Sequence, residues 1–232
     1  MENKEMEKFQ NWLDEQLRNK RKILVLEAGC GSASHLSFKN EAYIVGIDIS
    51  KEQLLRNKQI NEAILGDIQD YRLPSEKFDL IICWAVLEHL LYPEKALYNF
   101  INAIKKDGLI VLALPNVLSI KGLVTKYTPF FIHKLYYKKI MGRKIVGKEG
   151  YGPFRTYLKF LLAPKILKSY FEKHGFTIEY YETMDISNSI WWKEKSQIAR
   201  FLMNIYRGLK EIMRIVSFGK LGDSDFILVL KK

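Results

Sequence analysis

The sequence predicts an α/β fold in which helices cover both faces of a mostly parallel sheet. Short apolar runs alternate with amphipathic, helix-like segments through the first half of the chain. The first apolar run ends in Glu27, and Gly29 and Gly31 follow at once. This arrangement is typical of a buried parallel strand that turns tightly into a helix and leaves room for a ligand at the turn.

Seven runs have the length and composition of strands. They lie near Ile23–Glu27, Tyr43–Ile47, Ala63–Leu65, Phe78–Cys83, Gly108–Leu114, Phe176–Glu182 and Asp225–Leu230. Between them, helices are expected at Lys51–Gln59, Pro93–Ile104 and Pro164–Lys173. Within residues 1–20, an amphipathic helix that packs on the main domain is predicted by the helical spacing of Met6, Phe9, Leu13 and Leu17.

The length fits one domain with an addition or two small domains, and a single domain over residues 1–232 with a substantial core is preferred. Hydrophobic residues make up 48% of the 232 positions. No window is long and charge-free enough to cross a bilayer, and the charged N-terminus is unlike a secretory signal. Because Cys30 and Cys83 are the only cysteines and both adjoin expected strands, a disulfide framework is not expected. A cytoplasmic setting is therefore the expectation.

The net charge of +11 is concentrated in one segment. Thirteen Lys and Arg against two acids fall between Pro115 and Phe176, which gives this segment +11 and leaves a sum of zero for the rest. A partner attracted by the basic charge is therefore expected to bind to this segment.

The glycine turn favours a cationic ligand. A dinucleotide-binding turn has glycine or alanine at the third position of its motif, where this chain has Ser34. The carboxylate of Glu27 would repel a pyrophosphate but attract a cation, such as the amino group and sulfonium of S-adenosylmethionine. A plain strand-to-helix turn with no ligand is the alternative.

Two further acids stand at the ends of the next two expected strands. Asp48 follows the second strand, where a carboxylate can accept both hydroxyls of a ribose. A helix N-cap is the alternative role, but Ser50 can already fill it. Asp67 follows the third strand and could accept from an adenine amino group while Ile68 lies along the ring. Alone, Gly66-Asp67 would equally suit a turn.

These motifs in this order resemble class I S-adenosylmethionine-dependent methyltransferases. The resemblance rests on Glu27-x-Gly-x-Gly31, Asp48, Gly66-Asp67, the run Phe78–Leu90 and the run Leu109–Asn116. It covers residues 20–116 and, less closely, Pro164–Glu182. One departure is Ala33, where the family often has another glycine.

The resemblance implies both a fold and a binding site. The fold is a Rossmann-like sheet of seven strands, with the last strand antiparallel and the ligand at the carboxyl ends of the strands. Its cofactor is S-adenosylmethionine, with the first acid and glycines on the methionine part and the two aspartates on ribose and adenine. The cofactor-binding residues expected here are Glu27, Gly29, Cys30, Gly31, Asp48, Ile49, Asp67, Ile68 and Trp84. The link between the last two strands, residues 183–224, is longer than the family needs.

His89 is the candidate general base for the acceptor. It follows the fourth strand beside Glu88, and its ordinary pKa lies near neutrality. A histidine that ties the loop to the backbone is the alternative. Some relatives hold a divalent metal here with Glu-x-x-Glu-His, but Ala85 replaces the first glutamate, so no metal is expected.

Residues 116–160 are expected to form a basic lid that selects an anionic acceptor. Loops after strand ends commonly carry substrate contacts, and aromatic, proline and glycine residues interrupt the lysines here. The candidate substrate contacts are His133, Tyr151, Arg155 and Tyr157. A solvated basic surface is the alternative.

The acceptor class stays open. A small metabolite, anionic or linked to a lipid or sugar and methylated on oxygen or nitrogen, is preferred. RNA is an alternative, because cations and aromatics alternate in the basic segment. A scaffold without activity is another. Peripheral membrane contact through this segment and a helix at Ser196–Ser217 is a further alternative, although an apolar stripe usually packs on its own domain or a second copy. The oligomeric state is not determined.

Overall fold

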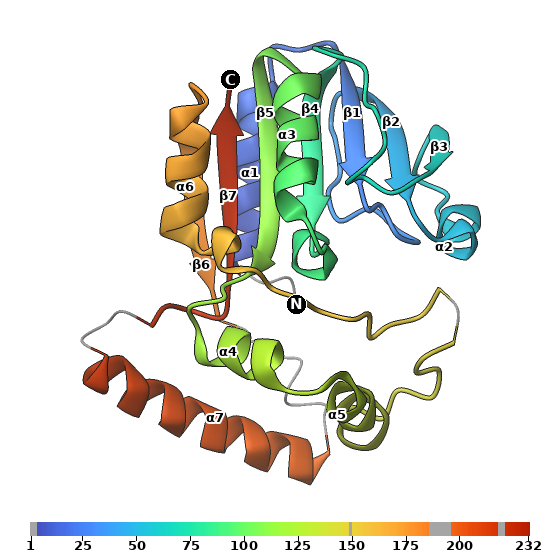
Figure 1. Cartoon of the computed structure of the whole chain (residues 1–232). Coiled ribbons are helices and arrows are strands. Elements are labelled where there is room, and N and C mark those ends of the chain that lie inside the picture. The colour runs from blue at the N-terminus through green and yellow to red at the C-terminus, as the bar shows by residue number, and fades with distance from the viewer. Residues whose placement is uncertain (1–3, 149, 186–195, 218–220) are drawn as a thin grey trace.

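The computed structural model describes residues 4–148, 150–185, 196–217 and 221–232. Its centre is a seven-stranded sheet of order β3-β2-β1-β4-β5-β7-β6 (Figure 1). The strands are β1 (Lys22–Ala28), β2 (Glu41–Asp48), β3 (Glu62–Leu65), β4 (Phe78–Trp84), β5 (Ile104–Pro115), β6 (Thr177–Met184) and β7 (Asp225–Lys231).

The sheet has the predicted direction pattern. The neighbours from β3 to β5 pair in parallel, whereas β7 pairs antiparallel with both β5 and β6. Residues Leu109–Leu114 of β5 are buried throughout, as expected for a strand covered on both faces. The Rossmann-like fold with a last antiparallel strand is therefore confirmed.

Helices cover both faces of the sheet. On one face, α1 (Lys4–Leu17) buries Phe9, Leu13 and Leu17 completely against β1, β4, β5 and β7. On the other face lie α3 (Pro93–Ala103) and α6 (Pro164–Lys173), each opened by a proline that suits a first helical turn. Figure 1 shows α3 and α6 in front of the sheet and α1 behind it.

The expected helix after the glycine turn is absent, which corrects the strand-to-helix interpretation. Residues 29–40 are turns and irregular structure, and the first helix after β1 is α2 (Lys51–Arg56), which follows β2. The face that such a helix would cover is occupied by α1 and by the buried side chain of Leu36. With the core of this face already filled, the twelve-residue link stays irregular.

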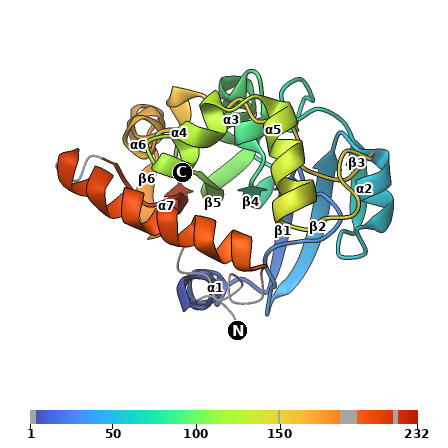
Figure 2. The ribbon, with the colours of Figure 1, turned by 90° about the horizontal axis from the view of Figure 1, so that it is seen from below.

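A layer of helices lies beyond the carboxyl ends of the parallel strands. It consists of α4 (Ile120–Tyr127), α5 (Phe130–Leu135) with a π-helical turn (Tyr136–Ile140), and α7 (Gln197–Val216) (Figures 1 and 2). Ser119 caps α4 by accepting from the backbone N–H of Gly122 at 2.9 Å. The helical layer therefore stands over the edge of the sheet at which the sequence places its ligand.

Two polar networks fasten this layer to the sheet. Lys121 of α4 contacts both carboxylate oxygens of Asp225, at the start of β7, at 2.5 and 2.7 Å. Lys210 of α7 pairs with Asp185 and, at 2.8 Å, with Asp223. Neither α4 nor α7 rests on apolar packing alone. Of the described helices, none is both long and apolar enough to span a membrane.

Candidate active site

The glycine turn closes back onto β2. The backbone N–H groups of Gly29 and Cys30 both donate to the carbonyl oxygen of Ile47, at 2.7 and 3.2 Å. Gly29 and Gly31 have φ of +69° and +54°, which glycine adopts without strain. A Cβ on Gly29 would lie 2.3 Å from Cγ2 of Val86. The turn therefore requires a glycine, and it places β1 against the segment that leads to His89.

Glu27 is a buried carboxylate with one oxygen free. Its Oε2 accepts from the hydroxyl of Ser34 at 2.5 Å, while Oε1 has no hydrogen-bond partner among the described residues. Burial raises the pKa of Glu27, and the hydrogen bond from Ser34 acts in the opposite direction. An orphaned carboxylate oxygen inside the protein is stabilised by a cationic or hydrogen-donating ligand.

Asp48 joins the glycine turn to the start of α2. One oxygen accepts from the N–H of Gly31 at 2.9 Å and the other from the N–H of Ser50 at 2.8 Å. Ser50 itself caps α2, as expected. The largely buried carboxylate of Asp48 is thereby held at the carboxyl end of β2, with further lone pairs on both oxygens.

The remaining expected cofactor residues differ in how much side chain they present. Asp67 accepts from the backbone N–H and the side-chain amide of Gln69, so it also forms the turn after β3. Ile49 is exposed, whereas Ile68 and Cys30 are core residues with little accessible side chain. Burial also raises the pKa of the Cys30 thiol to about 12, so it stays protonated. Little of the Ile68 side chain is accessible for the predicted contact with the adenine ring.

Trp84 ends β4 and is half-buried. Its ring is stacked on the imidazole of His35, with centroids 5.3 Å apart and planes at 16°. His35 follows Ser34 on the irregular link, so this stack packs the link against the sheet. Burial lowers the pKa of His35, which keeps its imidazole neutral against the indole ring.

His89 ends a short 3-10 turn (Leu87–His89) after β4. Its Nδ1 lies 2.8 Å from the carbonyl oxygen of Arg155. Because a carbonyl can only accept, Nδ1 carries the proton and Nε2 is the basic nitrogen. Burial lowers the pKa of His89, while this hydrogen bond raises it to a smaller extent. A neutral imidazole whose Nε2 makes no hydrogen bond with the described residues meets the requirements of a general base.

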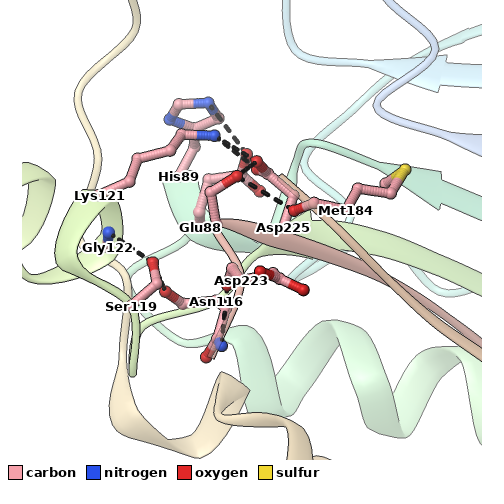
Figure 3. A network of polar contacts seen from close by, with 10 residues as sticks. Glu88, His89, Asn116, Ser119, Lys121, Gly122, Met184, Asp223 and Asp225 are labelled. Atoms are coloured by element: carbon pink, nitrogen blue, oxygen red, sulfur yellow. Dashed lines mark hydrogen bonds and ion pairs between the residues drawn. The ribbon is translucent and has the colours of Figure 1, made fainter. Parts of the chain in front are cut away.

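Glu88 lies beside His89 and is the more deeply buried of the two. Its Oε1 is 3.9 Å from Nε2 of His89, and its Oε2 has no partner among the described residues (Figure 3). Burial raises the pKa of Glu88 to about 8, with Lys121 lowering it and Asp225 raising it by smaller amounts. At neutral pH this group is therefore mostly protonated.

The segment after Gly150 crosses the site as a strap, defined here as residues 150–158. At one end Arg56 of α2 donates to the carbonyl of Gly150 at 2.6 Å and lies 4.3 Å from the ring centroid of Tyr151. At the other end the N–H groups of Tyr157 and Leu158 donate to the carbonyl of Glu88, at 2.8 and 3.0 Å. The strap thus links the end of α2, which follows β2, to the 3-10 turn that follows β4.

The structure brings three of the four predicted substrate residues onto this strap. Tyr151 contacts Arg56, and Arg155 lies over the ring of Tyr157 at 5.4 Å. His133 lies apart on α5, and in the described part of the chain no hydrogen bond or ring contact joins it to the other predicted residues. His133 therefore stays a prediction that these contacts do not support.

Comparison with known proteins identifies the family. A family model described as a methyltransferase domain matches residues 2–181. An uncharacterised protein of Methanocaldococcus jannaschii is 29% identical over 186 residues, which are 77% of each chain. The ubiquinone biosynthesis O-methyltransferase of Glaesserella parasuis is 31% identical over 106 residues, covering 40% of this chain and 45% of the relative.

Solved structures share the fold. A SAM-dependent methyltransferase from Archaeoglobus fulgidus matches with a TM-score of 0.54 and 18% identity, over 96% of this chain and 94% of that one. The magnesium protoporphyrin IX methyltransferase of Synechocystis, with bound SAM, matches with a TM-score of 0.53 and 14% identity, over 99% and 78%. The chain belongs to the methyltransferase domain family and is a class I enzyme dependent on S-adenosylmethionine.

The residues present fit this cofactor. The Oε1 of Glu27, which has no partner among the described residues, would meet the cationic methionine end of the cofactor. Asp48, at the adjoining strand end, keeps acceptor capacity for ribose hydroxyls. Among the described residues, no group of three or more His, Cys, Asp and Glu could hold a metal ion.

Two residues of the site were missed as functional candidates. In the sequence, Ser34 stands only as a break in a glycine motif, whereas in the structure its hydroxyl donates to Glu27. Glu88 was seen beside His89 but given no role. The sequence signal for Glu88 is an acid within an apolar run, four residues after the end of β4, because a carboxylate buried there is costly unless it is used or neutral.

Proposed function

We propose that this methyltransferase acts on an oxygen or nitrogen atom of a small metabolite that is anionic or linked to a lipid or sugar. The observation that carries the proposal is the position of His89, whose free Nε2 lies at the ligand edge under the strap. The glycine turn, on the donor side, lies against Val86. The carbonyl of Val86 accepts from the N–H of His89, on the acceptor side, so the two sides of the site are adjacent.

The chemistry needs little more than positioning and one proton transfer. The cofactor supplies a methyl group already activated by its positive sulfur, and S-adenosylhomocysteine is the leaving product. Glu27 and Asp48 would orient the donor, and Nε2 of His89 would take the proton from the acceptor as the new bond to carbon forms. If the acceptor is already deprotonated, His89 would only hold it in position.

Residues 116–160 would serve as the acceptor lid. Within the strap, Arg155 is exposed, and in the described part of the chain its guanidinium contacts only the ring of Tyr157, so it is available to an anionic group. Lys121 and Lys126 are engaged instead, with Asp225 and with the carbonyl of Leu158. Among these three cations, Arg155 is therefore the proposed contact for the acceptor's charge.

The test uses a cofactor with an isotopically labelled methyl group and extracted metabolite pools. Mass spectrometry should find one metabolite fraction that gains a single labelled methyl with the wild-type protein and much less with His89→Ala. A gain confined to nucleosides from digested RNA would contradict the small-metabolite proposal. Loss of S-adenosylhomocysteine binding in calorimetry, with no product in any pool, would favour a scaffold.

A further inference from the structure

The helix α7 presents an apolar face that the described protein does not cover. Six of its side chains recur every three or four positions and so share one side of the helix. They are 44–65% exposed, and they are Ile198, Phe201, Ile205, Leu209, Ile212 and Val216, here called the α7 apolar face. Isolated exposed apolar residues are ordinary, but a continuous stripe of this length marks an interaction surface.

The side of α7 that packs on the protein is a different one. Ala199 and Met203 are buried against Ile140, Met141 and Tyr206, and Lys210 on the same side reaches Asp223. Of the two usual roles expected for the apolar stripe, packing on its own domain is not seen among the described residues, and packing on a second copy stays untested. A small, partly ionic side of the helix makes these contacts, and the described residues leave the apolar face uncovered.

The charge around this face favours a lipid surface with anionic head groups. On α7, Arg200, Arg207 and Arg214 recur every seven residues on another side, and Glu211 is the only acid of the helix. Basic residues on the polar side and large apolar residues on the other are typical of helices that lie in a membrane interface. The neighbouring basic segment, residues 115–176, adds a net charge of +11.

The same charge argues against the two other occupants. A symmetric dimer through the helical layer would bring two copies of one basic surface together, which like-charge repulsion opposes. A nucleic acid would satisfy the cations but not the apolar face, because five of its six side chains are aliphatic and Phe201 offers the only ring among them for base stacking. An anionic bilayer satisfies both the cations and the apolar face.

We propose that the α7 apolar face docks on membranes rich in anionic lipid, with α7 lying in the plane of the head groups. This goes beyond the proposed function and does not depend on the acceptor. Because the helical layer covers the carboxyl edge of the sheet, docking would hold the active site close to the bilayer (Figure 1). No membrane span is needed for such binding.

The test is co-sedimentation of the full chain with vesicles of phosphatidylcholine alone or with about 30% phosphatidylglycerol. Binding should require the anionic lipid and weaken as salt rises. The variant Ile205→Glu places a charge on the α7 apolar face, whereas Asn204→Glu places the same charge one residue away on the polar side. We expect roughly a 10- to 100-fold loss of partition for Ile205→Glu and little loss for Asn204→Glu.

Calorimetry with S-adenosylhomocysteine shows whether each variant is folded and keeps its donor site, separately from docking. Equal loss of vesicle binding in both variants would overturn the proposal, as would no binding of the wild type at low salt. A wild-type dimer in sedimentation that Ile205→Glu converts to a monomer, without vesicle binding, would assign the face to a second copy. Binding of RNA abolished by Ile205→Glu would likewise overturn it.

Discussion

His89 and Arg155 are joined by a hydrogen bond from the imidazole Nδ1 to the backbone carbonyl, at 2.8 Å, although 66 residues separate them in the chain. Arg155 thus contributes its backbone to the orientation of His89, while its guanidinium stays exposed over Tyr157. The backbone of this residue and its side chain therefore make separate contacts. Substitutions of its side chain test only the second.

Arg155→Ala should raise the KM for an anionic acceptor and leave the affinity for S-adenosylhomocysteine unchanged. The carbonyl that fixes His89 remains, so kcat should change little. Steady-state kinetics and calorimetry measure the three quantities. Lys159→Ala, another exposed cation just past the strap, is the control. Equal KM values for Arg155→Ala and wild type would remove Arg155 from the acceptor site.

His89→Ala should lower kcat by about 10²–10⁴-fold if His89 takes the acceptor proton. Burial holds the pKa of His89 below 6.5, so the basic form of Nε2 predominates at neutral pH. For the wild type, kcat should fall on the acid side as pH drops through that lowered pKa. An unchanged pH profile in His89→Gln would show that the histidine only positions the loop.

Glu27→Gln should weaken S-adenosylhomocysteine binding by roughly 10- to 100-fold, because it removes the charge that faces a cationic amino group. The hydrogen bond from Ser34 can be kept by the amide oxygen, so the local fold should survive. Calorimetry measures the dissociation constant. Glu41→Gln, on the exposed start of β2, should bind like the wild type. Equal affinity in the two variants would contradict the assignment of Glu27.

Glu88→Gln should change how stability depends on pH. Burial raises the pKa of Glu88 to about 8 from its ordinary 4.5, so the folded protein keeps this proton while the unfolded chain loses it. Wild-type stability should therefore fall between pH 4.5 and 8, at up to about 1.4 kcal/mol per pH unit from this group, and level off above that.

The measurement for Glu88 is the free energy of unfolding by urea across this pH range. Glu88→Gln should lose that decline, whereas Glu172→Gln, an exposed acid on α6, should keep the wild-type dependence. If the curves for wild type and Glu88→Gln run parallel, Glu88 is already ionised in the folded protein.

Gly29→Ala should destabilise the protein more than Gly142→Ala does. Both glycines have positive φ, +69° and +66°, so each substitution should cost about 1–2 kcal/mol of backbone strain. A Cβ at Gly29 would also meet Val86 at 2.3 Å, whereas nothing lies within 4 Å of one at Gly142. The additional loss at Gly29 should be about 1–3 kcal/mol, measured by urea unfolding. Equal losses would mean that Val86 moves aside freely.

Local patterns in the sequence predicted most of the sheet and the donor side of the site. The strands coincide with apolar runs, and the acids at the ends of β1, β2 and β3 were identified by their place after those runs. Such features depend on neighbours along the chain. The helix expected after Gly31 is absent because of a segment that is distant in the chain. The N-terminal helix α1 fills the face of the sheet that the expected helix would have covered.

By itself, the sequence determined the α/β class, the methyltransferase family and the order of the acids at the strand ends. Only the tertiary structure decided which nitrogen of His89 is basic, that Glu88 is buried beside it, and which side of α7 stays uncovered. The physical reason is distance along the chain. Propensity and periodicity act over a few residues, whereas burial and the choice of hydrogen-bond partner depend on segments that meet only in the folded protein.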